Sequence, residues 1–143
     1  MTKREQLVTW LQDSGKLADW RARGRKAVGG THNACAATAS QPFIDLGIIP
    51  RTVTWAETLA TDLKLTGAFK ASGDRGDVQP GDVVVCLDLN DNGAADHIWL
   101  VAKDYGNGWY GCFDNQTKYL IHRRRLDGAD GKTAMRGRLR LTI

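Results

Sequence analysis

A cysteine at the start of a small-residue segment is the side chain best placed for chemistry in this sequence. Cys35 follows a loop that contains Gly29 and Gly30, and it precedes the run Ala-Ala-Thr-Ala-Ser, which predicts the first turn of a helix. The positive end of a helix dipole and its free N–H groups favour the thiolate, the nucleophilic form of cysteine. Free cysteines are also common as small buried residues. Cys35 therefore needs partners before it is assigned as a nucleophile.

Three histidines are candidates for the base that a cysteine nucleophile requires. His97 begins the apolar run Ile-Trp-Leu-Val directly after a polar loop, which predicts a strand edge between water and core. His32 lies in the loop just before the cysteine. His122 stands beside three arginines, and we expect it to be solvated. His97 is the predicted base, although a structural role at a strand edge would explain it equally well.

Polar residues that would orient this base follow the next predicted strand. Asp114 and Asn115 come directly after the segment 109–113. If 97–102 and 109–113 form a hairpin, the start of the first strand lies near the end of the second. An acceptor at either position would bind the imidazole N–H of His97 and fix its tautomer. A polar turn would account for the same residues, so both candidates stay open.

Helix signals dominate the first half of the chain. Two capping-box spacings predict helices over residues 3–13 and 55–65. The segment 21–33 has no periodicity and predicts a loop. The helix of the candidate nucleophile should run toward Leu46, and Pro42 inside it predicts a kink or two short helices.

Strand signals dominate the second half. They predict strands over residues 83–87, 97–102, 109–113 and 119–122, followed by a C-terminal strand. That last strand alternates cleanly, which predicts a half-buried strand whose outer face is lined by Arg136, Arg138 and Arg140. Helices before strands predict an α+β fold, with N-terminal helices packed on a C-terminal antiparallel β-sheet. We expect one domain over residues 1–143.

Composition narrows the classes of partner. The net charge of +4 is concentrated in three arginine-rich clusters, which favours polyanions such as nucleic acid or an acidic cell-surface polymer. Aromatic residues do not interleave with these clusters, which argues against nucleic acid. No run approaches 18 apolar residues, so no membrane insertion is expected, and the N-terminus has no signal-peptide pattern. Three cysteines without a CxxC pair indicate neither a disulfide framework nor zinc.

Several of these motifs together resemble the NlpC/P60 and CHAP superfamily of cysteine peptidases and amidases. The resemblance rests on Cys35, on the turn Pro80-Gly81-Asp82 before a valine run, on the strand that follows His97, and on Asp114-Asn115. In that superfamily a Pro-Gly-Asp turn opens the first core strand, and a later strand carries the histidine base. The resemblance is strongest over residues 29–122.

The resemblance implies a papain-like fold and hydrolysis of an amide bond in peptidoglycan peptides. Cys35 would attack the carbonyl carbon, and His97 would take and return the proton. Asp114 or Asn115 would orient His97. The oxyanion would meet the backbone N–H of the nucleophile and a second donor among Thr31, His32 and Asn33.

The absence of an export signal suggests a phage lysin or a secreted effector, made in the cytoplasm and acting at the bacterial wall. Two alternatives remain. One is a cysteine hydrolase or acyltransferase that acts on a non-wall substrate. The other is a catalytically silent basic binding module, which would not require the three site residues together. No cofactor is expected.

One further pattern resembles half of a calcium loop. Residues from Asp88 to Asp96 match D-x-[DN]-x-[DN]-G and place Asp96 at the ninth position. The twelfth position holds Trp99, so the bidentate glutamate is missing. We therefore favour a surface hairpin loop, with a calcium site that orders the approach to the base as the alternative.

Overall fold

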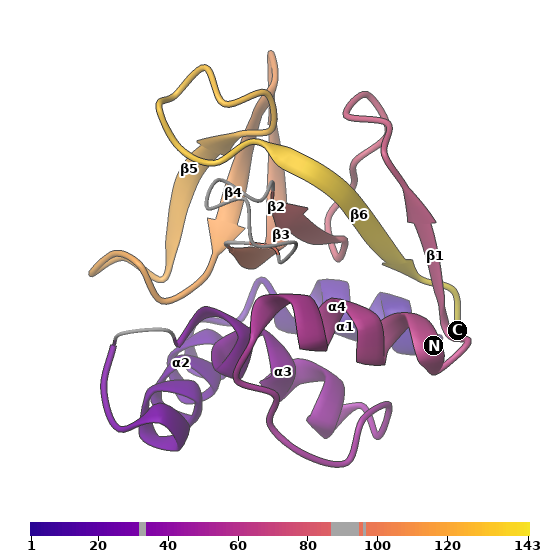
Figure 1. Cartoon of the computed structure of the whole chain (residues 1–143), viewed down its shortest axis with the longest axis vertical. Coiled ribbons are helices and arrows are strands. Elements are labelled where there is room, and N and C mark those ends of the chain that lie inside the picture. Colours follow the sequence, from indigo (N-terminus) through magenta and orange to yellow (C-terminus); the bar gives the residue numbers. More distant parts are fainter. Residues whose placement is uncertain (32–33, 87–94, 96) are drawn as a thin grey trace.

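The chain forms an α+β fold in this computed structural model, which describes residues 1–31, 34–86, 95 and 97–143. The helices are α1 (Lys3–Trp10), α2 (Ser14–Val28), α3 (Cys35–Asp45) and α4 (Ala56–Leu65). The strands are β1 (Phe69–Ser72), β2 (Val83–Cys86), β3 (Ile98–Gly106), β4 (Trp109–Phe113), β5 (Ile121–Arg125) and β6 (Met135–Leu141). The helices gather on one side of the sheet (Figure 1). The predicted α+β class is confirmed.

The six strands form one antiparallel sheet with the order β1-β6-β2-β3-β4-β5. The predicted hairpin between the strand after His97 and the strand before Asp114 is confirmed as β3 and β4, with Val101 opposite Cys112. β5 then pairs with β4 and places His122 opposite Cys112. Strand β1 was not predicted from the sequence.

Both faces of the sheet are buried at its centre, along β2 and the first half of β3. Val83 and Val85 of β2 pack against the helices in the larger apolar cluster. Their neighbours Val84 and Cys86 point the other way and join a second cluster that includes Trp99. A continuous apolar strand is what burial on both faces requires, because successive side chains alternate between the two faces.

The predicted arginine-lined outer face of the last strand is wrong in one respect. Arg138 is only 5% exposed and donates to the carboxylate of Asp77 at 2.9 Å. Arg140 donates to the buried carboxylate of Asp82 at 2.8 Å. Because β6 lies inside the sheet between β1 and β2, these guanidinium groups are used to neutralise buried or half-buried acids.

The predicted loop over 21–33 is wrong over most of its length, since α2 continues to Val28. Asp13 caps the helix start by accepting from two backbone N–H groups, and Gly29 ends it with a φ of 74°. Gly24 is buried in its middle. Arginine, lysine and alanine give this helix its helix propensity. Its contact with α3 is made through a glycine, so its sequence lacks apolar periodicity.

The helix of the candidate nucleophile is a single element with Pro42 inside it, so the alternative of two short helices is wrong. Pro42 has no N–H to give to the Thr38 carbonyl one turn earlier. In the same turn the Ser40 hydroxyl donates to the Ala36 carbonyl, and the Gln41 side-chain amide donates to the Ala37 carbonyl. The capping box predicted for the helix over residues 55–65, now α4, is absent. Trp55 is the N-cap residue, and its side chain makes no capping hydrogen bond.

Within the described part of the chain, no helix combines the length and the apolar character that crossing a bilayer demands.

Replacing Gly24 with alanine should destabilise the protein although alanine is the better helix former. A Cβ at position 24 would lie 2.6 Å from the backbone N and Cα of Thr38, so α2 would have to move away from α3. We expect a loss of about 1–3 kcal/mol in the free energy of unfolding, against a helix-propensity gain of about 1 kcal/mol. Chemical denaturation measures it. Ala22→Gly, at an exposed position of α2, calibrates the propensity effect, and an increase in stability for Gly24→Ala would contradict the close approach.

Candidate active site

The start of α3 positions Cys35. It is the first residue of the helix, and the preceding Ala34 offers no side-chain cap. The N–H groups of the first turn have no carbonyl partner within the helix, and the backbone of Ala36 is among the groups that lower the pKa of the Cys35 thiol against the effect of burial. Cys35 is partly exposed, whereas Cys86 and Cys112 are buried. Of the three thiols, Cys35 alone combines solvent access with free helical donors.

His97 lies between this thiol and the carboxylate of Asp114. Its Nε2 is 2.8 Å from Asp114 Oδ2, and the residue is 4% exposed. The Cys35 thiol lies close enough to His97 for each group to shift the pKa of the other. Since a carboxylate only accepts, Nε2 carries the proton, and Nδ1 is the ring nitrogen that remains for the thiol. The structure thus brings together three of the four predicted site residues.

Opposing effects set the protonation of this pair. Burial raises the pKa of the Cys35 thiol, but interactions with His97 and with the backbone of Ile98 and Ala36 outweigh burial, and the pKa lies below its usual value. Burial lowers the pKa of His97, but the hydrogen bond with Asp114 and the interaction with Cys35 outweigh it and raise the pKa. The two shifts converge, which favours a thiolate–imidazolium pair.

Asp114 is a buried carboxylate whose two oxygens receive hydrogen bonds from four donors. Oδ2 accepts from His97 Nε2 and, at 3.4 Å, from the Cys112 thiol. Oδ1 accepts from His122 Nε2 at 2.9 Å and from the backbone N–H of Gln116 at 3.0 Å. Although burial raises the pKa of Asp114, the two histidines hold it well below its usual range. The carboxylate therefore stays charged beside His97.

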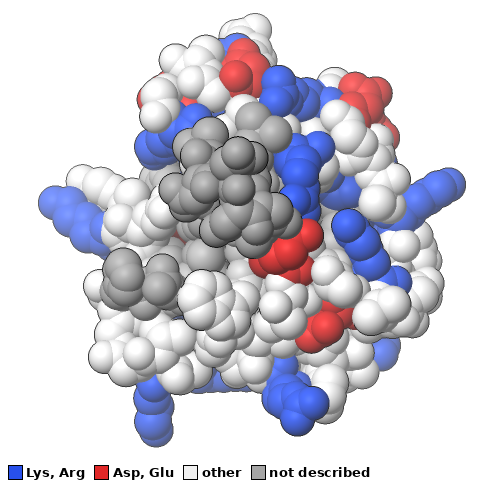
Figure 2. Space-filling view, in the orientation of Figure 1, with Lys and Arg blue, Asp and Glu red and all other residues white. Residues whose placement is uncertain are grey.

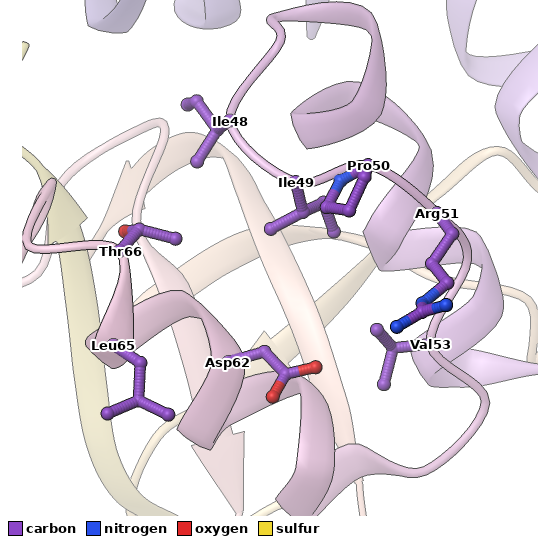
Figure 3. Close-up of a pocket in the computed structure, with 8 residues that line it drawn as sticks. All are labelled: Ile48, Ile49, Pro50, Arg51, Val53, Asp62, Leu65 and Thr66. Atoms are coloured by element: carbon purple, nitrogen blue, oxygen red, sulfur yellow. The ribbon is translucent and has the colours of Figure 1, made fainter.

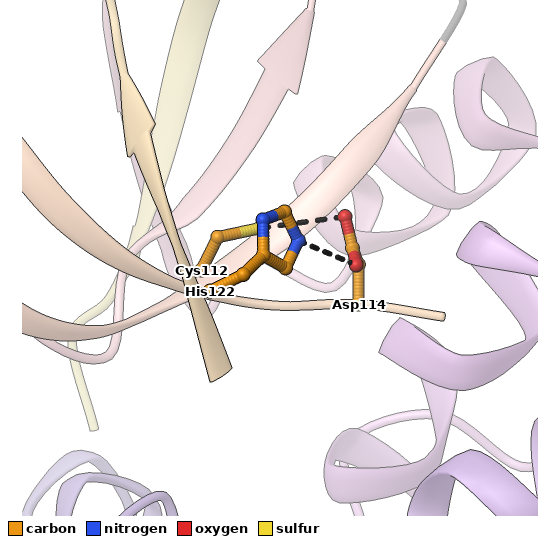
Figure 4. A group of neighbouring side chains, drawn as sticks. All are labelled: Cys112, Asp114 and His122. Carbon is orange, nitrogen blue, oxygen red and sulfur yellow. Dashed lines mark hydrogen bonds and ion pairs between the residues drawn. The ribbon is translucent and has the colours of Figure 1, made fainter. Parts of the chain in front are cut away.

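His122 is the site residue that sequence reasoning missed. We expected it to be solvated, but its side chain is 9% exposed and directed at Asp114 (Figure 4). Its other ring nitrogen, Nδ1, lies 3.4 Å from the ammonium of Lys132. An ammonium only donates, so Nδ1 is the acceptor and Nε2 carries the proton given to Asp114. The sequence held one signal for this position. Side chains two residues apart in a strand lie on the same face, so His122 shares a face of the sheet with Arg124.

Asn115, the fourth predicted residue, does not contact His97. Its side-chain amide donates to the Thr31 carbonyl at 2.7 Å, and its backbone carbonyl accepts from the Arg25 guanidinium at 3.1 Å. Arg21 of α2 donates to the carbonyls of Thr117 and Tyr119. These bonds hold the loop after β4 against α2 and against the segment that leads to Cys35.

Two sequence predictions lie outside the described residues. His32 and Asn33, considered as oxyanion donors, are among them. So are residues 88–94 and 96 of the segment for which a surface hairpin loop was favoured and a calcium site was the alternative. Ala95 is the described residue of that segment, and its N–H donates to Glu57 at 2.8 Å.

One group among the described residues has the donor atoms for a metal ion. Potential ligand atoms of Cys112, Asp114 and His122 lie within 4.8 Å of one another. Burial raises the pKa of the Cys112 thiol well above 9.0, so it stays protonated and donates to Asp114. The ammonium of Lys132 also approaches His122. This chemistry fits a hydrogen-bonded network better than a cation site.

A separate pocket of about 270 Å³ lies between the segment after α3 and the end of α4 (Figure 3). Ile48, Ile49 and Leu65 make most of its wall apolar, and Arg51 and Asp62 are its charged residues. None of the residues around Asp114 lines it. No cysteine or histidine lines this pocket.

Comparisons with known proteins leave the chain without an assigned family. No protein-family model matches it, and no curated protein sequence is significantly similar to it.

Cys35 should react with iodoacetamide faster than the other two thiols, by about 100-fold or more at pH 7, because thiolate is the reacting form. Burial raises the pKa of Cys86 to about 11 and raises that of Cys112 well above its usual value, whereas that of Cys35 is lowered. Peptide mass spectrometry at timed intervals measures the three rates. His97→Ala removes the interactions that lower the pKa of Cys35, so its labelling should require a higher pH. Equal labelling of all thiols in the folded protein would refute the assignment.

His122→Leu should disturb the site without touching Cys35 or His97. Asp114 would keep the Gln116 N–H on Oδ1 but lose the side chain that holds it, and His97 would lose a fixed partner. We expect the labelling profile of Cys35 to move to higher pH and any Cys35-dependent activity to fall about tenfold. His122→Gln, which keeps an N–H donor, should restore most of both. Identical profiles for leucine and wild type would show that Asp114 is held without His122.

Proposed function

We propose that this chain is a cysteine endopeptidase or amidase with a papain-like fold, of the NlpC/P60–CHAP type, that hydrolyses an amide bond in peptidoglycan peptides. The observation that supports it most is the alignment of Cys35, His97 and Asp114. A nucleophile at a helix start, a base beside it and a charged group behind the base form the constellation that acyl transfer requires. The wall substrate rests on the resemblance of the motifs.

The proposed reaction uses the pair in two steps. The Cys35 thiolate attacks the amide carbonyl carbon. The backbone N–H of Cys35 at the helix start donates a hydrogen bond to the developing oxyanion. The imidazolium of His97 gives its proton to the leaving amine, which departs and leaves a thioester. His97 then takes a proton from water, the hydroxide displaces Cys35, and the acid product leaves. Asp114 stabilises the imidazolium in both steps without giving up its charge.

Basic side chains offer limited support for an anionic wall as the partner. Lys and Arg protrude from the face in Figure 2, but Asp and Glu lie among them rather than leaving a continuous basic band. Arg23 is paired with Asp19 and Asp45. This interspersed pattern favours neither nucleic acid nor a silent polyanion-binding module, the second alternative.

Turbidity loss of purified peptidoglycan tests the proposal. Wild type should clear the suspension, and mass spectrometry of the fragments identifies the bond. Cys35→Ala should lower the rate by about 10³-fold or more, because it removes the nucleophile. Cys86→Ala is the matched control, since it removes a buried thiol with a raised pKa and should keep the activity. A chelator arm tests the calcium alternative at Asp88–Asp96.

The outcomes separate the alternatives. If the Cys35→Ala variant clears peptidoglycan as fast as wild type, Cys35 is not the nucleophile. No clearing on several wall types, with selective labelling of Cys35 intact, would favour a hydrolase or acyltransferase on another substrate. Absence of both clearing and selective Cys35 labelling would favour a binding module.

A further inference from the structure

We propose that the cavity between β5 and the segment 127–134, which leads to β6, binds a ligand through a carboxylate or phosphate group. The cavity has a volume of about 460 Å³, and Arg124, Lys132 and Gln116 are among the residues that line it. It lies on the side of the sheet where Arg124 packs over Trp99, a residue of the cluster that faces away from the helices. Nothing in the proposed hydrolytic mechanism uses Arg124.

Arg124 is a buried cation without an anion. It is 1% exposed, its Nη2 donates to the Thr133 carbonyl at 2.8 Å, and its Nε has no hydrogen-bond partner. Among the described residues, no carboxylate forms an ion pair with it. Burying an unpaired charge is costly. The Trp99 ring, 5.4 Å from the guanidinium carbon, offsets only part of that cost through a cation–π interaction.

The neighbouring acids are already engaged. Asp130 accepts from the backbone N–H groups of Arg125 and Lys132. Against the effect of burial, these N–H groups and then the charge of Arg124 lower the pKa of Asp130. Asp127 is paired with the Arg125 side chain at 3.1 Å. Asp114 holds the two histidines. Among the described residues, however, neither Arg124 nor Lys132 forms an ion pair with any of these acids.

The second cation makes the cavity suitable for an oxyanion. The Lys132 ammonium has only a long contact of 3.4 Å with His122, and an anionic oxygen would be a stronger acceptor. A guanidinium presents a planar set of donors that matches two oxygens, and an ammonium adds a point charge. The volume lies in the range of small-molecule sites and exceeds a single oxyanion. We therefore infer an anionic group carried on a larger body.

Calorimetric titration of the Cys35→Ala chain tests this inference without any hydrolysis. The probes are N-acetylglycine, its neutral amide N-acetylglycinamide, and inorganic phosphate, all at constant ionic strength. We expect saturable binding of N-acetylglycine or of phosphate and none of the amide, and the better binder identifies the anion. Lys132→Met should weaken that binding about tenfold. Lys103→Met, which removes a lysine of β3, is the matched control and should not change it.

Three results would overturn the inference: no saturable binding of either anion, equal binding of the amide, or equal effects of the two lysine variants. If Lys132→Met proves unstable, the side-chain Nε–H resonance of Arg124 decides the matter in the parent chain. It must shift on titration with the binding anion. Because Cys35 is absent from every arm, failure here leaves the proposed hydrolase unaffected, and loss of the hydrolase leaves this site unaffected.

Discussion

The buried negative charge of Asp114 is the constraint on which the site depends. A carboxylate away from water is tolerated only when its oxygens are fully hydrogen-bonded. Its donors come from the approach to β3, from β4, from β5 and from the turn after β4: His97, Cys112, His122 and the Gln116 N–H. A slip of one residue in the pairing of β4 with β5 would turn His122 to the other face. The register of the sheet and the charge of the site therefore stabilise each other.

The positive charge of the chain is used largely for internal structure. Arg21 and Arg25 of α2 bind carbonyls of the loop that follows Asp114, and Arg138 and Arg140 of β6 bind buried or half-buried acids. The first group matters for the site, because α2 thereby holds the loop that carries the orienting carboxylate. Net charge alone suggested a polyanion as partner, but most of these guanidinium groups already have an acceptor.

Local signals in the sequence identified Cys35, His97 and Asp114 because each lies at an end of an element, where a helix start or a strand boundary is visible in the residues themselves. His122 was missed because its role depends on the pairing of β4 with β5, which no local pattern specifies. Helix α2 was missed for a related reason: it contacts α3 through Gly24, so its buried face lacks the apolar period that sequence reasoning requires. The sequence could not decide between Asp114 and Asn115, because the choice depends on which of the two side chains the turn after β4 directs toward His97.

Asp114 serves two histidines, and their other neighbours make the two unequal. The imidazole of His97 faces a thiol, which gives up its proton and leaves an anion that favours the imidazolium. The imidazole of His122 faces an ammonium, which can only donate and so occupies the second nitrogen of the ring. His122 supplies a second hydrogen bond, which fixes Asp114 and, against the effect of burial, lowers its pKa. The carboxylate that His122 holds in place faces His97, the histidine whose proton the proposed reaction moves.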